Sequence, residues 1–239
     1  MIMLWPALAS LVLPSAPLAP SRAGNTRMQF GNFKNPFADK ADGATTIALT
    51  IGFNCMERGP KSILGQLDSL AAAADTSTTD GIAGLCGDTA LALLRRSSEW
   101  VSCSGSAEHK GEDDDALAAF DRLVIKEAAK FDDRPTSATV DAALAAAGVG
   151  AGGAATVTPK PTIAVVCVIA CIMGDREEEV SKDFQGDAAK LQAALQELAA
   201  AGNGDEEVFA FELLWVPGGD DEVLDSDEIM LDWPELMPC

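Results

Sequence analysis

Acidic side chains are concentrated near the end of the sequence, in ELLWVPGGDDEVLDSDEIMLDWPELMPC, residues 212–239. Clustered carboxylates bind divalent cations, or act as an acid and a base when burial separates their pKa values. An EF-hand loop needs glycine at its sixth position, but loops that start at Asp220 or Asp225 place Asp225 or Met230 there. The run also follows a Gly-Gly pair, which is typical of an exposed turn. We therefore expect a solvated acidic loop here.

The same segment is the candidate interaction surface of the protein. Its last part contains the apolar residues Ile229, Leu231, Trp233, Leu236 and Met237, which predicts that this part packs against the sheet. The formal net charge of -20 disfavours nucleic acid, because phosphates would be repelled, and favours a basic protein partner. The candidate interaction residues are Trp215, Asp220, Asp221, Glu222, Asp225, Asp227, Glu228 and Trp233.

The six cysteines could carry redox chemistry, although none forms a CxxC pair. Cys167 and Cys171 lie four residues apart in an apolar run that is typical of a strand. Four strand residues span about 13 Å, whereas a disulfide needs Cα atoms within about 7 Å of each other. We therefore predict that these two are core thiols. The candidate redox thiols are Cys55, Cys86, Cys103 and Cys239.

Other catalytic and metal-binding patterns are not indicated. His109 is the only histidine, and we place it in an exposed turn over 109–115, away from an activated nucleophile. A structural zinc site would need four Cys or His ligands, usually in closely spaced pairs. The glycine-rich match at 148–153 precedes a strand, whereas a dinucleotide fingerprint follows one. We predict no catalytic residue, no metal and no cofactor.

The first 43 residues have the character of a targeting presequence. MIMLWPALASLVLPSAPLA is apolar but interrupted by prolines, so it suits a signal sequence better than a membrane-spanning helix. PSRAGNTRMQFGNFKNPF then carries basic residues and no acid, as transit peptides do. This order is typical of entry into plastids of secondary origin; the alternative is a disordered tail. We expect a plastid protein, stromal or peripheral to the thylakoid or envelope.

Hydrophobic periodicity predicts one α+β domain over 44–239. The expected order is β-α-α-β-α-β-α-β, with a small mixed four-stranded sheet and helices packed on one side of it. The apolar stretch at 162–173 has only twelve residues, so it is a buried strand, and we expect no transmembrane helix in the mature chain. A weaker helix over 137–147 and a flexible Gly/Ala loop over 145–161 complete the interpretation. The strands are expected at 45–53, 99–104, 162–173 and 207–216. The main helices are expected at 63–71, 77–94 and 113–131, with a last one that contains Leu191, Leu195 and Leu198 and stops at Gly202.

Several stretches in a fixed order resemble a known family. They are TTIALTIGF, ADTSTTDGIAGLCGDTALALLRRSSEWVSC, AAFDRLVIKEAAKF and FELLWVPGGDDEVLDSDEIMLDWPELMPC. Together they are similar to the domain-of-unknown-function family 1517 of cyanobacteria and plastids, over residues 44–239. The resemblance implies a non-enzymatic protein that is associated with chloroplast membranes and adjusts photosynthesis to changing light. Relatives carry a membrane-spanning region before this domain and this chain has none, so we expect peripheral association.

The residues and the resemblance together predict a regulatory or interaction protein of the plastid. Its expected partner is a protein, such as a photosynthetic or plastid-envelope membrane complex, bound through the acidic surface or the 212–239 segment. The alternative is a switch that senses redox state through exposed cysteines, or pH through clustered carboxylates with mutually raised pKa values.

Overall fold

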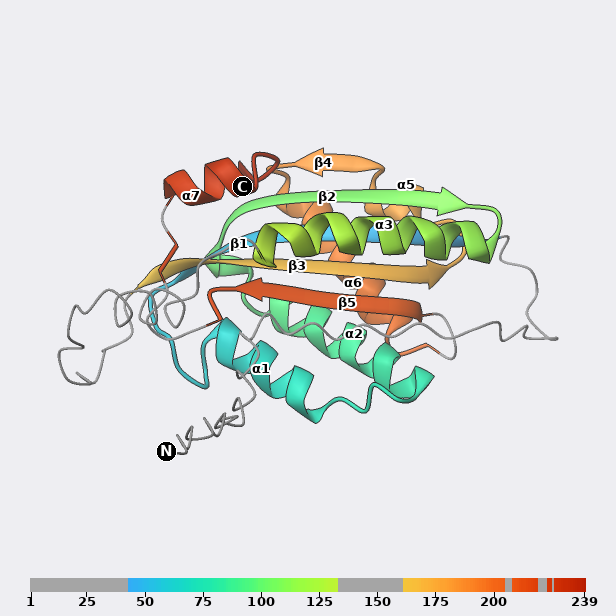
Figure 1. Ribbon diagram of the computed structural model, residues 1–239, viewed down its shortest axis with the longest axis horizontal. Helices are drawn as coiled ribbons and strands as arrows, with labels where there is room; N and C mark the ends of the chain where they lie inside the picture. The colour runs from blue at the N-terminus through green and yellow to red at the C-terminus, as the bar shows by residue number, and fades with distance from the viewer. Residues whose placement is uncertain (1–42, 133–160, 205–207, 219–222, 225) are drawn as a thin grey trace, which may run out of the picture.

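An antiparallel sheet runs through the middle of the molecule, with helices on both of its faces (Figure 1). The computed structural model describes residues 43–132, 161–204, 208–218, 223–224 and 226–239. The strands are β1 (Ala44–Cys55), β2 (Trp100–Lys110), β3 (Thr162–Met173), β4 (Asp183–Gln185), β5 (Val208–Val216) and β6 (Met237–Pro238). The helices are α1 (Ile63–Ala73), α2 (Thr79–Leu94), the 3-10 helix η1 (Ser97–Glu99), α3 (Asp113–Asp132), α5 (Glu177–Val180), α6 (Ala188–Ala201) and α7 (Ser226–Asp232).

The two longest strands, β1 and β3, form the centre of the sheet. β1 pairs with β2 on one side and with β3 on the other, and β5 lies beyond β3. The short strands β4 and β6 pair with successive parts of the outer edge of β2. The expected α+β class is therefore confirmed, but two details were wrong. The sheet has six strands among the described residues, and every pair is antiparallel, so it is not a mixed four-stranded sheet.

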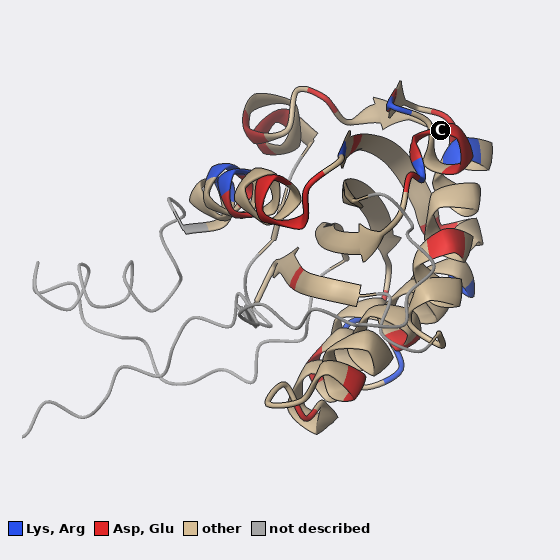
Figure 2. Cartoon of the chain, turned by 90° about the vertical axis from the view of Figure 1, so that its right-hand side faces the viewer, with Lys and Arg blue, Asp and Glu red and all other residues tan. Residues whose placement is uncertain are grey.

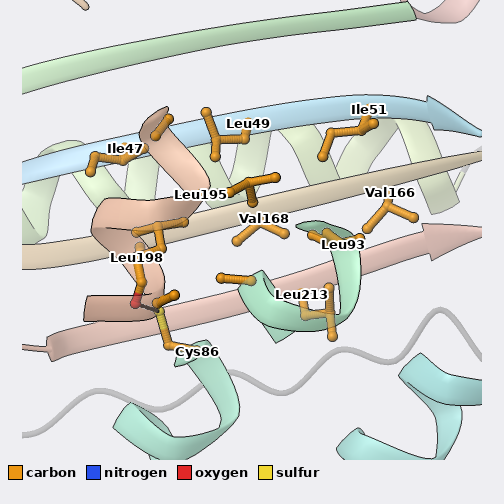
Figure 3. Close-up of a cluster of buried hydrophobic side chains, with 14 of the residues drawn as sticks. Ile47, Leu49, Ile51, Cys86, Leu93, Val166, Val168, Leu195, Leu198 and Leu213 are labelled. Atoms are coloured by element: carbon orange, nitrogen blue, oxygen red, sulfur yellow. Dashed lines mark hydrogen bonds between the residues drawn. The ribbon is translucent and has the colours of Figure 1, made fainter. Parts of the chain in front are cut away.

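One face of the sheet packs against α1, α2 and α6. Figure 3 shows Ile47, Leu49 and Ile51 of β1 pointing toward side chains of α2 and α6. In the same cluster the thiol of Cys86 on α2 donates to the carbonyl oxygen of Leu198 on α6, at 3.8 Å. Residues spaced by two along β1 point to one side of the sheet, which is why a single run of alternate residues builds this core.

The other face packs against α3 and α7, so the expectation of helices on one side only was wrong. Phe120 and Val124 of α3 share a buried cluster with Cys167 and Ile169 of β3. The sequence of β3 explains this arrangement: it is apolar at nearly every position, as in strands that are buried on both faces. Cys167 is confirmed as a core thiol, and so is Cys171 on the same face.

Most element boundaries agree with the periodicity, and the long apolar strand at 162–173 is reproduced. β2 is longer than expected, because it continues to Lys110 along the full edge of β1, and His109 therefore lies in a strand. The helix expected over 137–147 lies outside the described residues, as does the Gly/Ala loop over 145–161 except for its last residue. Of the presequence expected over 1–43, only Gly43 is described.

Candidate functional site

The acidic segment is partly helical. Asp227 and Glu228 lie in the first turn of α7, so the expected solvated loop was wrong for this part. Acidic side chains in a first turn interact favourably with the positive end of the helix dipole, and this explains why the chain can turn helical here. The remaining candidate acids, Asp220, Asp221, Glu222 and Asp225, lie outside the described residues.

The two candidate tryptophans are core residues on opposite faces of the sheet. Trp215 is 3% exposed and belongs to the cluster of α1, α2 and α6. Trp233 is fully buried under the α3 side, where its ring meets that of Phe131 at 5.3 Å between centroids and an interplanar angle of 67°. Neither ring can contact a partner at the surface. Trp233 instead anchors the segment that follows α7.

Anchoring at Trp233 leaves part of α7 turned outward. Met230 is 64% exposed and Leu231 is 81% exposed, next to the exposed acids Asp227 and Glu228. We call these four exposed side chains the α7 surface. Docking of the last residues is confirmed for Ile229, Trp233 and Leu236, but Leu231 and Met237 are exposed. Leu231 is exposed because the seven residues of α7 cannot turn every apolar side chain inward.

A partly buried ion pair connects α3 to the end of the chain. The Nζ of Lys130 lies 2.8 Å from Oε2 of Glu127 and also contacts the carboxylate of Glu235. Burial by itself lowers the pKa of Lys130, but its bonds to these two carboxylates outweigh that effect and hold the pKa above its usual value. This group was missed in the sequence. Its signal was the position of Glu127 within the apolar stripe of α3, three residues after Val124 and four before Phe131.

A cavity of about 500 Å³ lies beside this ion pair, bounded by β1, β2, β4, α3 and the residues after α7. That volume is in the range of small-molecule sites. Glu127 and Glu235 contribute to its wall. Acidic and hydroxyl side chains make up most of its polar lining. The other polar groups that line it are Thr50, Ser104, Ser106, Lys126, Asp183 and Gln185.

Charge elsewhere is distributed around the periphery. Figure 2 shows acidic positions on the surrounding helices, while the strands are largely free of charge. In the part of the chain that the structure describes, no group of three or more His, Cys, Asp or Glu side chains is placed to hold a metal ion. Among those same residues, no helix has both the length and the apolar character to cross a bilayer.

Three of the four candidate redox thiols are buried, so among them only Cys239 is an exposed cysteine. Burial, followed by the charge of Glu99, raises the pKa of Cys55 to about 11, and burial raises that of Cys86 to about 12. A raised thiol pKa lowers the fraction of reactive thiolate at neutral pH. Cys239 is exposed, and its thiol interacts with that of the buried Cys103. The structure brings together only this pair among the four.

His109 lies near the end of β2, in a half-buried position. Its Nδ1 is 3.4 Å from Oγ1 of Thr45, and its backbone N–H donates to the carboxylate of Glu177 at 2.9 Å. Cys103 lies on the same strand, about 20 Å away at the usual rise per residue. The two side chains therefore do not form a nucleophile and base pair.

Comparison with known proteins gives a family match and two curated relatives. The family model described as "Protein of unknown function (DUF1517)" matches residues 43–239. The chain is 29% identical to "Protein FLAP1 homolog A" of Synechocystis sp. over 176 residues, which cover 74% of this chain and 52% of that protein. It is 24% identical to "FLUCTUATING-LIGHT-ACCLIMATION protein 1, chloroplastic" of Arabidopsis thaliana over 178 residues, covering 74% of this chain and 43% of that protein. The chain thus spans about half the length of these relatives. No solved structure matches it significantly.

Proposed function

This chain belongs to the DUF1517 family, as its motifs predicted, and from that premise we propose that it regulates photosynthesis during light acclimation in a plastid. The names of the two relatives support the role, because one of them is a chloroplastic fluctuating-light-acclimation protein and the other is its cyanobacterial homologue. The signal-like and transit-like composition of residues 1–43 supports a plastid of secondary origin. The protein acts there without catalysis, in the stroma or peripherally at the thylakoid or envelope.

The protein acts by binding a basic, amphipathic segment of a protein partner on the α7 surface. The observation that carries this proposal is the exposure of Met230 and Leu231 beside Asp227 and Glu228, on a helix whose other face is anchored in the core. Exposed apolar side chains rimmed by charge are typical of protein interaction sites. The net charge of -20 favours a basic partner and accelerates its encounter at low salt.

The proposal is tested by cross-linked capture of partners from lysed plastids, in light and in darkness, with the full chain as bait. The binding variant is Met230→Ser with Leu231→Ser. The matched control is Ile125→Ser, because Ile125 is 65% exposed on α3, outside the α7 surface. We expect to recover the same basic partner with the wild type and with the control. The double variant should recover at least tenfold less of it.

Added salt should weaken the captured complex, because exposed charges are screened within about 10 Å at 0.1 M ionic strength. A partner that is recovered equally with the double variant would refute binding at the α7 surface. Deletion of the gene for this protein in its source organism tests the proposed role in light acclimation. Unchanged recovery of photosynthetic yield after repeated light shifts would contradict a function in light acclimation.

A second candidate function is redox sensing. One observation favours it, namely that Cys103 and Cys239 are in contact although they are far apart in the sequence. Sensing of pH through clustered carboxylates remains a prediction from the sequence.

A further inference from the structure

We propose that Cys103 and Cys239 form a reversible intramolecular disulfide, which fastens residues 226–239 to the edge of the sheet. The disulfide gives the redox-sensing candidate a specific site, but its formation depends neither on partner binding nor on the α7 surface.

The pairing of β2 with β6 places the two thiols on the same side of the sheet. Cys103 is opposite Met237, and Ser102 is opposite Pro238. The backbone N–H of Cys239 donates to the carbonyl oxygen of Val101 at 3.3 Å, so the antiparallel register continues to that position. Directly opposite residues point to the same face, as do residues spaced by two along a strand. Cys239 is therefore a diagonal neighbour of Cys103 on one face.

The separation of such neighbours is close to what a disulfide requires. Diagonal Cα atoms are about 7–8 Å apart, with shorter Cβ separations, and disulfides usually join Cα atoms about 4.4–6.8 Å apart. A shift of about 1 Å in β6 brings the pair into this range. β6 has only two residues and lies at the edge of the sheet, so it can make this shift without disturbing the central strands.

The neighbourhood keeps β6 close to Cys103. The backbone N–H of Gly186 donates to the carbonyl oxygen of Cys103 at 2.8 Å. A Cβ at Gly186 would lie 2.6 Å from the carbonyl oxygen of Pro238 and 3.2 Å from Cβ of Met237, so glycine permits this close approach. The turn between β4 and α6 thus packs against β6 and holds it beside β2.

The two thiols have complementary accessibility. Cys103 is fully buried, whereas Cys239 is exposed. Burial, and then the neighbouring Cys239, raise the pKa of Cys103 to about 12, so this thiol stays protonated at neutral pH. An external reagent therefore reaches Cys239 first. None of the other buried thiols has a second cysteine among the groups that shift its pKa.

The oxidant is a disulfide, such as oxidised glutathione or the disulfide form of a dithiol protein. The Cys239 thiolate attacks one of its sulfurs, forming a mixed disulfide and releasing one thiolate. Cys103 then loses its proton to solvent, and its thiolate attacks the Cys239 sulfur and releases the second thiolate. In total, two protein thiols and one disulfide give one protein disulfide and two thiols, and two electrons pass to the oxidant.

The test uses the full chain, equilibrated in a graded series of reduced and oxidised glutathione. After acid quenching, the free thiols are alkylated in denaturant and counted by intact mass, and linked peptides are mapped. We expect two fewer alkylated thiols of the six at the oxidising end, a single link between Cys103 and Cys239, and full reversal by reductant. The oxidised chain should also unfold at a higher urea concentration, because the link closes a long loop.

Three variants define the site. Cys103→Ser and Cys239→Ser should each abolish the link, while Cys55→Ser, a matched change of another buried thiol, should retain it. The proposal is overturned if all six thiols remain alkylatable across the series, if the link joins other cysteines, or if Cys239 stops at the glutathione mixed disulfide. The Met230→Ser, Leu231→Ser variant keeps both thiols, so loss of partner binding and loss of the disulfide are separate results.

Discussion

Replacement of Trp233 by alanine tests whether the end of the chain is part of the folded core. Trp233 is fully buried, and its ring packs edge-on against Phe131 of α3. It lies in the same cluster as Ile229 of α7 and Leu214 of β5. Its removal therefore takes away one of the contacts that hold α7 and the following segment against the sheet.

The magnitude follows from the area that is buried. A tryptophan side chain buries about 150–250 Å², and at about 25 cal/mol per Å² this area contributes about 4–6 kcal/mol. The edge-to-face pair adds about 0.5–1.5 kcal/mol, whereas collapse of the surroundings into the vacated space recovers part of the total. We expect Trp233→Ala to lower the free energy of unfolding by about 3–5 kcal/mol.

Urea denaturation, followed by far-UV circular dichroism, measures this loss. The matched control is Leu231→Ala, two residues away and 81% exposed, which should change stability by no more than about 0.5 kcal/mol. Trp233→Phe retains an aromatic ring against Phe131, so its loss of unfolding free energy should lie between those of Trp233→Ala and Leu231→Ala. If Trp233→Ala costs no more than the control, the end of the chain does not belong to the cooperative core, and the α7 surface has no fixed position.

Two further substitutions test the ion pair and the packing of β4. Lys130→Met should cost about 1–3 kcal/mol, because it removes the cation that lies 2.8 Å from the buried carboxylate of Glu127 and leaves only the more exposed Lys126, at 3.4 Å, beside it. Since the pKa of Lys130 is raised in the folded state, its contribution is complete below the reference value of 10.5 and is lost as the pH rises through the higher folded value. The difference in unfolding free energy between wild type and variant, measured by urea denaturation, should thus narrow at strongly alkaline pH. A difference that stays constant would show that the ion pair does not contribute this stability. Gly105→Ala should cost about 1–3 kcal/mol, because the new Cβ would collide with the ring of Phe184, whereas Gly111→Ala has open space and should be near neutral in thermal melts; equal effects would refute the packing.

The long elements could be predicted because their patterns are local. The strand over 162–173 is continuously apolar and bounded by proline and glycine, and the helix that begins at Asp113 repeats apolar residues at helical spacing. The short strands β4 and β6 were missed, because a strand of two or three residues has no pattern of its own. The unpaired edge of β2 determines where they form.

The features of the candidate site were also only partly predictable from the sequence. The excess of acid and the exposed part of the segment around α7 could be expected from composition, since a chain with a net charge of -20 must place most carboxylates in water. Burial of Trp233 was expected from the apolar tail, but the exposure of Leu231 and Met237 was not, because only packing decides which apolar side chains of the tail turn inward.

By itself, the sequence determined the family, the fold class and the positions of the main elements, because these depend on motifs and periodicities that are read along the chain. Only the tertiary structure decided that both faces of the sheet are covered, that Lys130 on α3 meets Glu235 after α7, and that Cys103 meets Cys239. The two side-chain contacts join residues more than a hundred positions apart. The covering of both faces depends on two layers of helices that pack against the same strands. Such contacts are set by chain topology and side-chain packing, which no local pattern specifies.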